Sequence, residues 1–174
     1  MSSAGEVGLT PMADPQVVTR PQQLYVGIRG AVTMDTMRSI ADRIPVIIGW
    51  LTDRGIPVAG APFLRYWVID MERRLDVEAG VPVAEPVDGD GEVSPGVLPA
   101  GSFATVTHVG PYEELVGATA ALLTWADEHG LAFDVRPSPE GDVWACRLEC
   151  YHTNPIEVPD PARQETELAL KLAE

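Results

Sequence analysis

The sequence contains few residues that could support metal, disulfide or nucleophilic chemistry. It has two cysteines and three histidines among 174 residues. Cys146 and Cys150 are four positions apart on a predicted strand, which places their Cα atoms roughly 13 Å apart, beyond the reach of a disulfide. The histidines show no metal-ligand spacing, and no Ser-His-Asp signature is present. We therefore expect no metal site and no cofactor, and we interpret both cysteines as core residues.

Basic residues are also scarce, with 12 Lys and Arg against 26 Asp and Glu, for a net charge of −14. Such a charge repels phosphate backbones and argues against binding to nucleic acid. No apolar run approaches the ~20 residues that span a bilayer, and residues 1–8 lack the features of a signal peptide. We expect a cytoplasmic protein that contacts neither membrane nor nucleic acid.

Apolar residues make up 45% of the chain, enough for one domain with a substantial core. Residues 1–22 are rich in Ser, Gly, Pro and Gln without periodicity and predict a flexible tail. Residues 84–100 predict an exposed connection. Alternation and three- to four-residue apolar spacing predict the remaining elements. The strands are expected at 24–30, 63–70, 74–83, 103–109, 144–151 and 167–172, and the helices at 37–51, with a break near Pro45, and 115–125.

These elements repeat in the order strand-helix-strand-strand, which suggests a duplication with pseudo-repeats at about 23–83 and 101–174. In each predicted helix a tryptophan stands five residues before the terminal glycine, Trp50 before Gly55 and Trp125 before Gly130. The predicted fold is α+β: two such units form one curved antiparallel sheet, with both helices on one face and a ligand groove on the other.

The strand 144–151 has one apolar face and one mixed face, because side chains alternate along a strand. The apolar side carries Trp144, Cys146, Leu148 and Cys150, and the other side carries Ala145, Arg147, Glu149 and Tyr151. We expect the apolar side to meet the helices, and Glu149 and Tyr151 to line a groove on the opposite face. A carboxylate beside aromatic rings suits a flat cation. Alternatively, Glu149 is a solvated residue paired with Arg147 or another neighbour.

The strand 63–70 supplies further aromatic residues. Alternation groups Phe63 with Trp67 on one side and places Tyr66 on the other. An exposed Phe and Trp are a liability unless they line a pocket, so they are candidates for its walls. Burial of these rings in the core is the competing interpretation, and both can hold at the floor of a groove.

An ordered set of segments carries a more specific signal. They are GSFATVTHVGPYEEL (101–115), WADEHGL (125–131), RLECYHTNP (147–155), ETE (165–167) and DVEAGVPV (76–83). This set resembles the GyrI-like small-molecule-binding domain, which is also the effector-binding module of multidrug-sensing transcription activators. The resemblance covers about residues 24–172.

The resemblance implies the duplicated fold and a central groove in which Glu149 receives lipophilic cations between aromatic walls. Tyr151, Tyr112 and Trp67 correspond to those walls, and Phe63 and Tyr66 are further ligand-binding candidates. The activators carry a DNA-binding segment ahead of this domain, whereas only about 22 residues precede the first predicted strand here. We therefore expect a stand-alone module for drug sensing or sequestration.

Two other functions remain open. Some stand-alone members of the family hydrolyse cyclopropanoid DNA-alkylating compounds, and Glu149 and Tyr151 would be the catalytic residues of such an enzyme. A module that binds a protein partner, such as a gyrase-binding inhibitor, is the third possibility. Binding and hydrolysis would use the same groove, so the sequence does not separate them.

Overall fold

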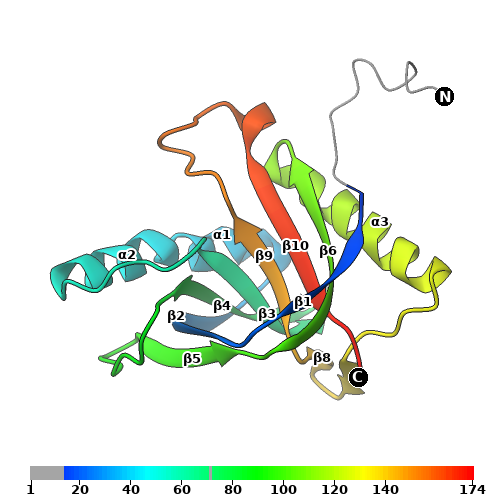
Figure 1. Ribbon diagram of the computed structural model, residues 1–174, viewed down its shortest axis with the longest axis horizontal. Helices are drawn as coiled ribbons and strands as arrows, with labels where there is room; N and C mark the ends of the chain where they lie inside the picture. Colours follow the sequence, from blue (N-terminus) through cyan, green and yellow to red (C-terminus); the bar gives the residue numbers. More distant parts are fainter. Residues whose placement is uncertain (1–13, 71) are drawn as a thin grey trace.

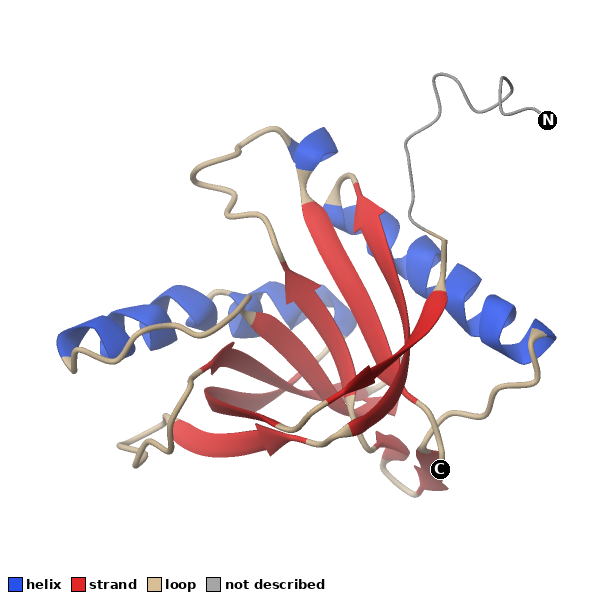
Figure 2. Ribbon diagram, in the orientation of Figure 1, coloured by secondary structure: helices blue, strands red, loops and turns tan. Residues whose placement is uncertain are grey.

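Ten strands form one antiparallel sheet within residues 14–70 and 72–174, the part of the chain that this computed structural model describes (Figures 1 and 2). Eight of them follow the order β1-β6-β10-β9-β3-β4-β2-β5, while β8 pairs with β3 and β7 pairs with β8. In chain order the strands are β1 (Gln16–Arg20), β2 (Gln23–Val32), β3 (Phe63–Asp70), β4 (Arg74–Pro82), β5 (Ser94–Leu98), β6 (Gly101–Val109), β7 (Val135–Ser138), β8 (Gly141–Trp144), β9 (Arg147–Tyr151) and β10 (Glu165–Lys171).

Helical segments connect the strands of each half. The α-helices are α1 (Met37–Ala41), α2 (Arg43–Asp53) and α3 (Leu115–Glu128), and the 3₁₀ turns are η2 (Met34–Thr36), η3 (Tyr112–Glu114) and η4 (Pro161–Arg163). The predicted first helix is divided at Asp42, between α1 and α2. Pro45 accounts for the division, because its ring excludes a regular helical position for the carbonyl of Ala41, four residues earlier. None of the helices in the described residues is long and apolar enough to cross a membrane.

The predicted α+β fold, with its two strand-helix-strand-strand units, is confirmed. One unit contributes β2, β4 and β3, and the other contributes β6, β10 and β9. The two units meet at the β3–β9 pair, and on each side of this pair the strands follow in the equivalent order. A β7–β8 hairpin is added to the second unit ahead of β9. A residue at the β3–β9 boundary therefore lies close to the pseudo-two-fold axis.

The sheet curls because two chain segments, β1–β2 and β5–β6, each run almost without interruption from one end of the strand order to the other. Only Pro21 and Gln22 separate β1 from β2, and only Pro99 and Ala100 separate β5 from β6. Since β1 pairs with β6 and β2 pairs with β5, the same two chain segments meet at both ends of the strand order (Figure 1). Proline lacks an N–H group for the ladder, so it suits both breaks.

Two predictions are wrong in this region. Within the predicted tail 1–22, Gln16–Arg20 form β1, whereas residues 1–13 lie outside the described part of the chain. Within the predicted connection 84–100, Ser94–Leu98 form β5. Each strand has five residues and is identified only by its partner, because so short a segment carries little alternation of its own.

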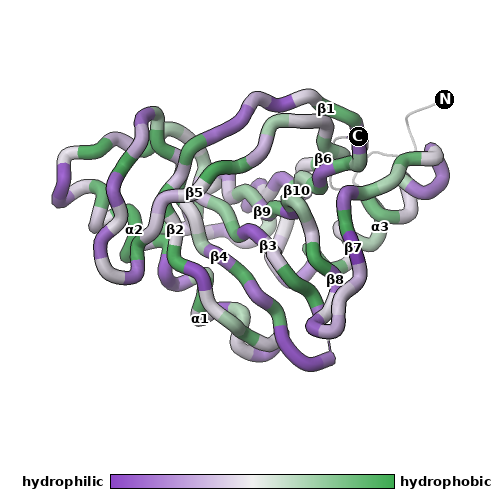
Figure 3. The backbone as a smooth tube through the Cα atoms, turned by 90° about the horizontal axis from the view of Figure 1, so that it is seen from below, coloured by the Kyte–Doolittle hydropathy of each residue, from purple (hydrophilic) through white to green (hydrophobic). Residues whose placement is uncertain are grey.

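Both helical layers cover the same face of the sheet. Leu64 packs in the core cluster beneath α1 and α2, and Leu168 packs in the cluster beneath α3. Both residues lie directly opposite Glu149 in the register, so their side chains leave the sheet on one side. Along the tube in Figure 3, hydrophobic and hydrophilic residues succeed one another through the long strands, as a sheet with two distinct faces requires.

A third core cluster fills the inner, helix-free face of the curl. It consists of Tyr25, Phe63, Phe103, Cys146, Leu148, Cys150 and Ala169. The apolar side of β9 thus packs inside the curl, and Glu149 lies on the helix-bearing face. This is the reverse of the predicted orientation of the strand. Residues 144–151 also form two strands rather than one, because Ala145 and Cys146 separate β8 from β9.

Candidate ligand-binding site

Glu149 lies at the centre of the sheet, between the two helical clusters. It is on β9 and faces Leu64 of β3 on one side and Leu168 of β10 on the other. The side chain is half-buried. No ion pair within 4.0 Å involves Glu149 among the described residues. The interpretation of Glu149 as ion-paired with Arg147 or another neighbour is therefore wrong, whereas its partial exposure leaves some contact with solvent.

Two phenols supply the polar partners of the carboxylate. The hydroxyl of Tyr151 donates a hydrogen bond to Oε1 of Glu149 at 2.8 Å. Burial, together with the negative charge of Glu149, raises the pKa of both Tyr151 and Tyr66 well above 10, so both phenols keep their protons and act as donors. The pseudo-two-fold arrangement places the two rings similarly, since Tyr66 follows Leu64 by two residues as Tyr151 follows Glu149.

The surroundings of Glu149 favour its protonated form. Burial raises the pKa of Glu149 above 4.5, although the hydroxyls of Tyr151 and Tyr66 and the charge of Arg147 oppose the shift. Burial outweighs the other contributions because an ionised carboxylate loses hydration that two neutral donors do not fully replace. A ligand cation placed beside Glu149 would supply the missing compensation.

Arg147 lies on the same face, one alternation before Glu149. Its guanidinium carbon is 4.7 Å from the centroid of the Trp144 ring and 5.9 Å from that of Tyr66. Burial lowers the pKa of Arg147, and the nearby Glu149 opposes that shift. The cation thus rests mainly on aromatic faces.

Tyr112 completes the aromatic group and belongs to the same half of the molecule as Tyr151, whereas Tyr66 comes from the other half. It begins η3, between β6 and α3, and its ring meets that of Tyr151 edge-on, with centroids 5.8 Å apart and planes at 75°. Tyr112 is 41% exposed, and its hydroxyl donates a 3.4 Å hydrogen bond to Oε1 of Gln164. Among the predicted ligand-binding residues, four therefore cluster: Glu149, Tyr151, Tyr66 and Tyr112.

The other two predicted wall residues, Phe63 and Trp67, lie on the opposite face of the sheet. Phe63 is 1% exposed and belongs to the inner cluster. Trp67 occupies a β-bulge, at which the register of β3 with β4 shifts between Tyr66 and Val68. The bulge reverses the alternation, so Ile69 packs with the helix-bearing face, and a fixed period of two cannot predict it.

A buried carboxylate on the opposite face, Glu78 on β4, was not anticipated. Its Oε1 accepts hydrogen bonds from the hydroxyl of Tyr25 at 2.6 Å and from Nε1 of Trp67 at 3.0 Å. Its cross-strand neighbours are Arg29 and Arg65, whose guanidinium carbons lie 4.3 Å and 3.7 Å from the Trp67 ring centroid. The sequence signal was weak, because β4 also carries Arg74 and Asp76 and its alternation does not single out Glu78.

A family model for the GyrI-like small molecule binding domain matches residues 13–172. No curated protein matches the chain. Among solved structures, EcmrR in complex with DNA is 20% identical with a TM-score of 0.74, and the match covers 92% of this chain and 57% of that chain. The chain thus spans little more than half of EcmrR. The C-terminal domain of EcmrR alone gives a TM-score of 0.70 at 20% identity, covering 92% of this chain and 98% of that one.

Two further structures share the fold. A hydrolase from Listeria innocua is 16% identical with a TM-score of 0.63, and the match covers 97% of this chain and 96% of that chain. SAV2435, solved bound to tetraphenylphosphonium, is 11% identical with a TM-score of 0.63, covering 92% of this chain and 94% of that chain. At these identities the likenesses establish the fold.

Proposed function

Because the chain belongs to the GyrI-like family of small-molecule-binding domains, we propose that the cluster around Glu149 binds lipophilic aromatic cations. The observation that carries the proposal is the half-buried carboxylate of Glu149, which lies between two leucines and has no cationic group in contact among the described residues. Such a carboxylate gains more from a bound cation than a solvated one does, because the surrounding dielectric is lower.

The surrounding groups favour a delocalised cation over a compact one. Tyr151, Tyr66 and Tyr112 offer ring faces and edges, and each good cation–π contact contributes about 0.5 to 2 kcal/mol. A large aromatic cation also loses little hydration on entering. Since few directional hydrogen bonds are required, ligands of varied shape are expected to bind, as they do in drug sensing or sequestration.

Fluorescence titration with a cationic rhodamine, with tetraphenylphosphonium as competitor, tests the proposal. Wild type should bind the dye at micromolar affinity, and Glu149→Gln should weaken binding about tenfold or more. Glu165→Gln is the matched control, because it removes the same charge from an exposed position on β10. A neutral dye of similar shape should lose less affinity in Glu149→Gln than the cation does. Equal affinity of wild type and Glu149→Gln for the cation would refute the role of Glu149.

The hydrogen-bonded Glu149–Tyr151 pair favours one alternative function, hydrolysis of a cyclopropanoid alkylating compound. Glu149 would take a proton from water while the water oxygen bonds to the electrophilic ring carbon. The strained C–C bond breaks and its electron pair becomes a negative charge on the remainder of the ligand; the proton taken up by Glu149 then passes to that anion, which restores the carboxylate. The raised pKa of Glu149 suits a general base.

Product analysis distinguishes the two functions. If the protein is a hydrolase, mass spectrometry should detect the ring-opened water adduct forming faster than in buffer, with a loss of about 10²–10⁴-fold in Glu149→Gln. Tyr151→Phe keeps the ring and removes only the hydroxyl, so it tests that donor separately. Adduct formation at the rate seen in buffer alone would leave binding as the function.

A further inference from the structure

A cavity of about 290 Å³ opens on the inner, helix-free face of the sheet, separate from the Glu149 cluster. Its walls come from several strands and from the loops between them, and the third core cluster forms its floor. The apolar part of the lining includes Phe63, Leu98, Phe103, Leu148 and Cys150, together with Ala61 at its edge.

The floor of the cavity is closely packed. Phe63 and Phe103 are each 1% exposed, and the Phe63 ring packs edge-on against Tyr25, with centroids 5.1 Å apart and planes at 78°. Leu148 is held within the β9 ladder, opposite Arg65 of β3 and Ala169 of β10. An apolar ring placed on this floor would be buried without rearrangement of the sheet.

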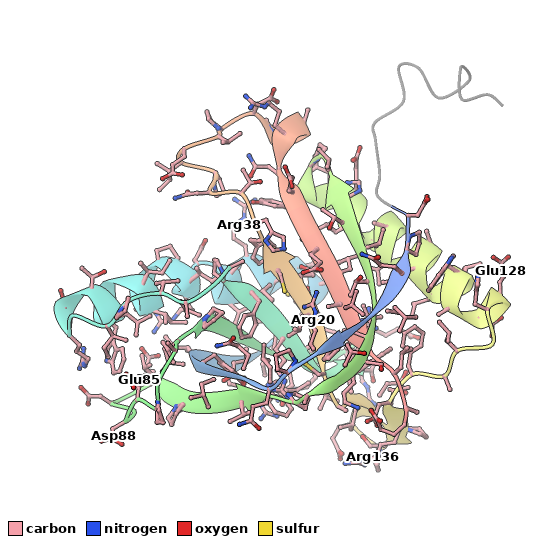
Figure 4. All side chains as sticks on the ribbon, in the orientation of Figure 1. Arg20, Arg38, Glu85, Asp88, Glu128 and Arg136 are labelled. Atoms are coloured by element: carbon pink, nitrogen blue, oxygen red, sulfur yellow. The ribbon has the colours of Figure 1, made fainter. Side chains whose placement is uncertain are left out.

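The rim is charged, and its cation comes from β1. Arg20 is half-buried, its guanidinium carbon lies 5.7 Å from the centroid of the Phe103 ring, and Figure 4 shows it over the middle of the sheet. Nη2 of Arg20 donates to Oε2 of Glu167 at 2.5 Å, while Oε1 of Glu167 lies 3.3 Å from Nε2 of His152. A guanidinium has five N–H donors, so the contact with Glu167 leaves others for a ligand.

We propose that this cavity is a second ligand site, which takes a small planar aromatic ring carrying an anionic group. The ring would lie on Phe63 and Phe103, and the anionic group would meet the guanidinium of Arg20. The volume is at the lower end of the range for ligand pockets, so the ligand is of one- or two-ring size. A guanidinium beside a hydrophobic floor suits a planar anion, because it can donate two parallel hydrogen bonds.

The two sites lie on opposite sides of one strand. Glu149 leaves β9 toward the helices, whereas Leu148 and Cys150 leave it toward the cavity. The inner site selects for negative charge through Arg20, and the outer site is proposed to select for positive charge through Glu149. The inner site does not depend on the outer one.

Isothermal titration calorimetry with naphthalene-2-sulfonate tests the inner site, because the sulfonate stays ionised and the ring system is planar. We expect saturable binding to wild type, and weaker binding of 2-naphthylmethanol and of 2-naphthylmethylammonium. Arg20→Gln should weaken sulfonate binding about tenfold. Ala61→Phe, which fills the cavity from the loop before β3, should also weaken it.

Two controls separate this site from the rest of the molecule. Arg54→Gln removes an exposed arginine that pairs with Asp90 and should leave sulfonate affinity unchanged. Glu149→Gln should also leave it unchanged, so a failure of the proposed cation site does not affect this result. The inference is overturned if wild type shows no saturable binding, if the neutral or cationic naphthalene binds as tightly, or if Arg20→Gln and Ala61→Phe both retain full affinity.

Discussion

Two carboxylates, the buried Glu78 and the half-buried Glu149, are each hydrogen-bonded to a tyrosine and occupy opposite faces of the same sheet in very different surroundings. Glu78 accepts from Tyr25 and Trp67 and has an arginine as cross-strand neighbour on each side. Glu149 accepts from Tyr151 and has a leucine on each side. Arginines neighbour Glu78 across both strands, although neither forms an ion pair with it within 4.0 Å, whereas Glu149 has apolar cross-strand neighbours and its charge is proposed to attract a ligand. Cross-strand neighbours, more than burial alone, distinguish a structural carboxylate from a candidate binding group.

The largest expected effect is on stability, when the Glu78 side chain is removed. Glu78→Ala leaves the hydroxyl of Tyr25 and Nε1 of Trp67 without their buried acceptor, so we expect a loss of about 2–5 kcal/mol in the free energy of unfolding. Urea denaturation followed by tryptophan fluorescence measures it. Glu149→Ala is the matched variant and should lose less, since it removes the acceptor of one side-chain hydrogen bond rather than two. Equal losses in both variants would remove the distinction between the two carboxylates.

A smaller effect is expected when the space around Glu78 is narrowed. A Cβ atom added to Gly27 would lie 2.7 Å from the carbonyl oxygen of Ala79 and 2.7 Å from Oε2 of Glu78. Because the carbonyl belongs to the ladder and cannot move freely, Gly27→Ala should destabilise the fold by about 1–3 kcal/mol. Gly49→Ala on α2, where a Cβ meets nothing within 4 Å, should instead stabilise it by about 0.5–1 kcal/mol. Thermal denaturation of both variants and of wild type measures these changes. A Gly27→Ala protein as stable as wild type would contradict the prediction.

Glu149 should make both stability and cation binding depend on pH. Because burial raises the pKa of Glu149 in the folded protein, its protonated form contributes stability below the unfolded pKa, and that contribution is lost as pH rises through the folded value. Cation binding should show the opposite trend and strengthen over the same window, since only ionised Glu149 attracts a cation. Dye titrations across this range check the affinity, and Glu149→Gln should flatten the curve. An unchanged curve in that variant would assign the titration to another group.

The smallest effect is expected from a single hydroxyl. Tyr151→Phe removes the donor to Glu149 and keeps the ring that packs against Tyr112, so cation affinity should change by about 0.5–1.5 kcal/mol at most. Tyr25→Phe, the equivalent change at Glu78, should leave cation affinity unaffected and lower stability instead. Fluorescence titration and urea denaturation of both variants would show whether the two phenols have separate roles. A loss of cation affinity in Tyr25→Phe would show that they do not.

Local periodicity predicted most of the elements. The strand at Phe63–Asp70 has the predicted bounds, and β4 and β6 agree with the prediction within two residues. In long segments the alternation of apolar and polar residues is enough to predict a strand. The helix ends near Gly55 and Gly130 are also as predicted, and both glycines have φ of 69°, which favours glycine at the end of a helix. The short strands β1 and β5 could not be predicted in this way, since only pairing with distant segments defines them.

The sequence by itself determined that Glu149 and Tyr151 share one side of a strand and that Leu148 and Cys150 share the other, because this follows from the pleat of any strand. Only the tertiary structure decided which side meets the helices. Curling of the sheet buries both of its faces, so the apolar side fits the inner cluster as well as it would fit a helical layer. The bulge at Trp67 and the two arginines beside Glu78 also arise from the register of separate strands, which local sequence does not specify.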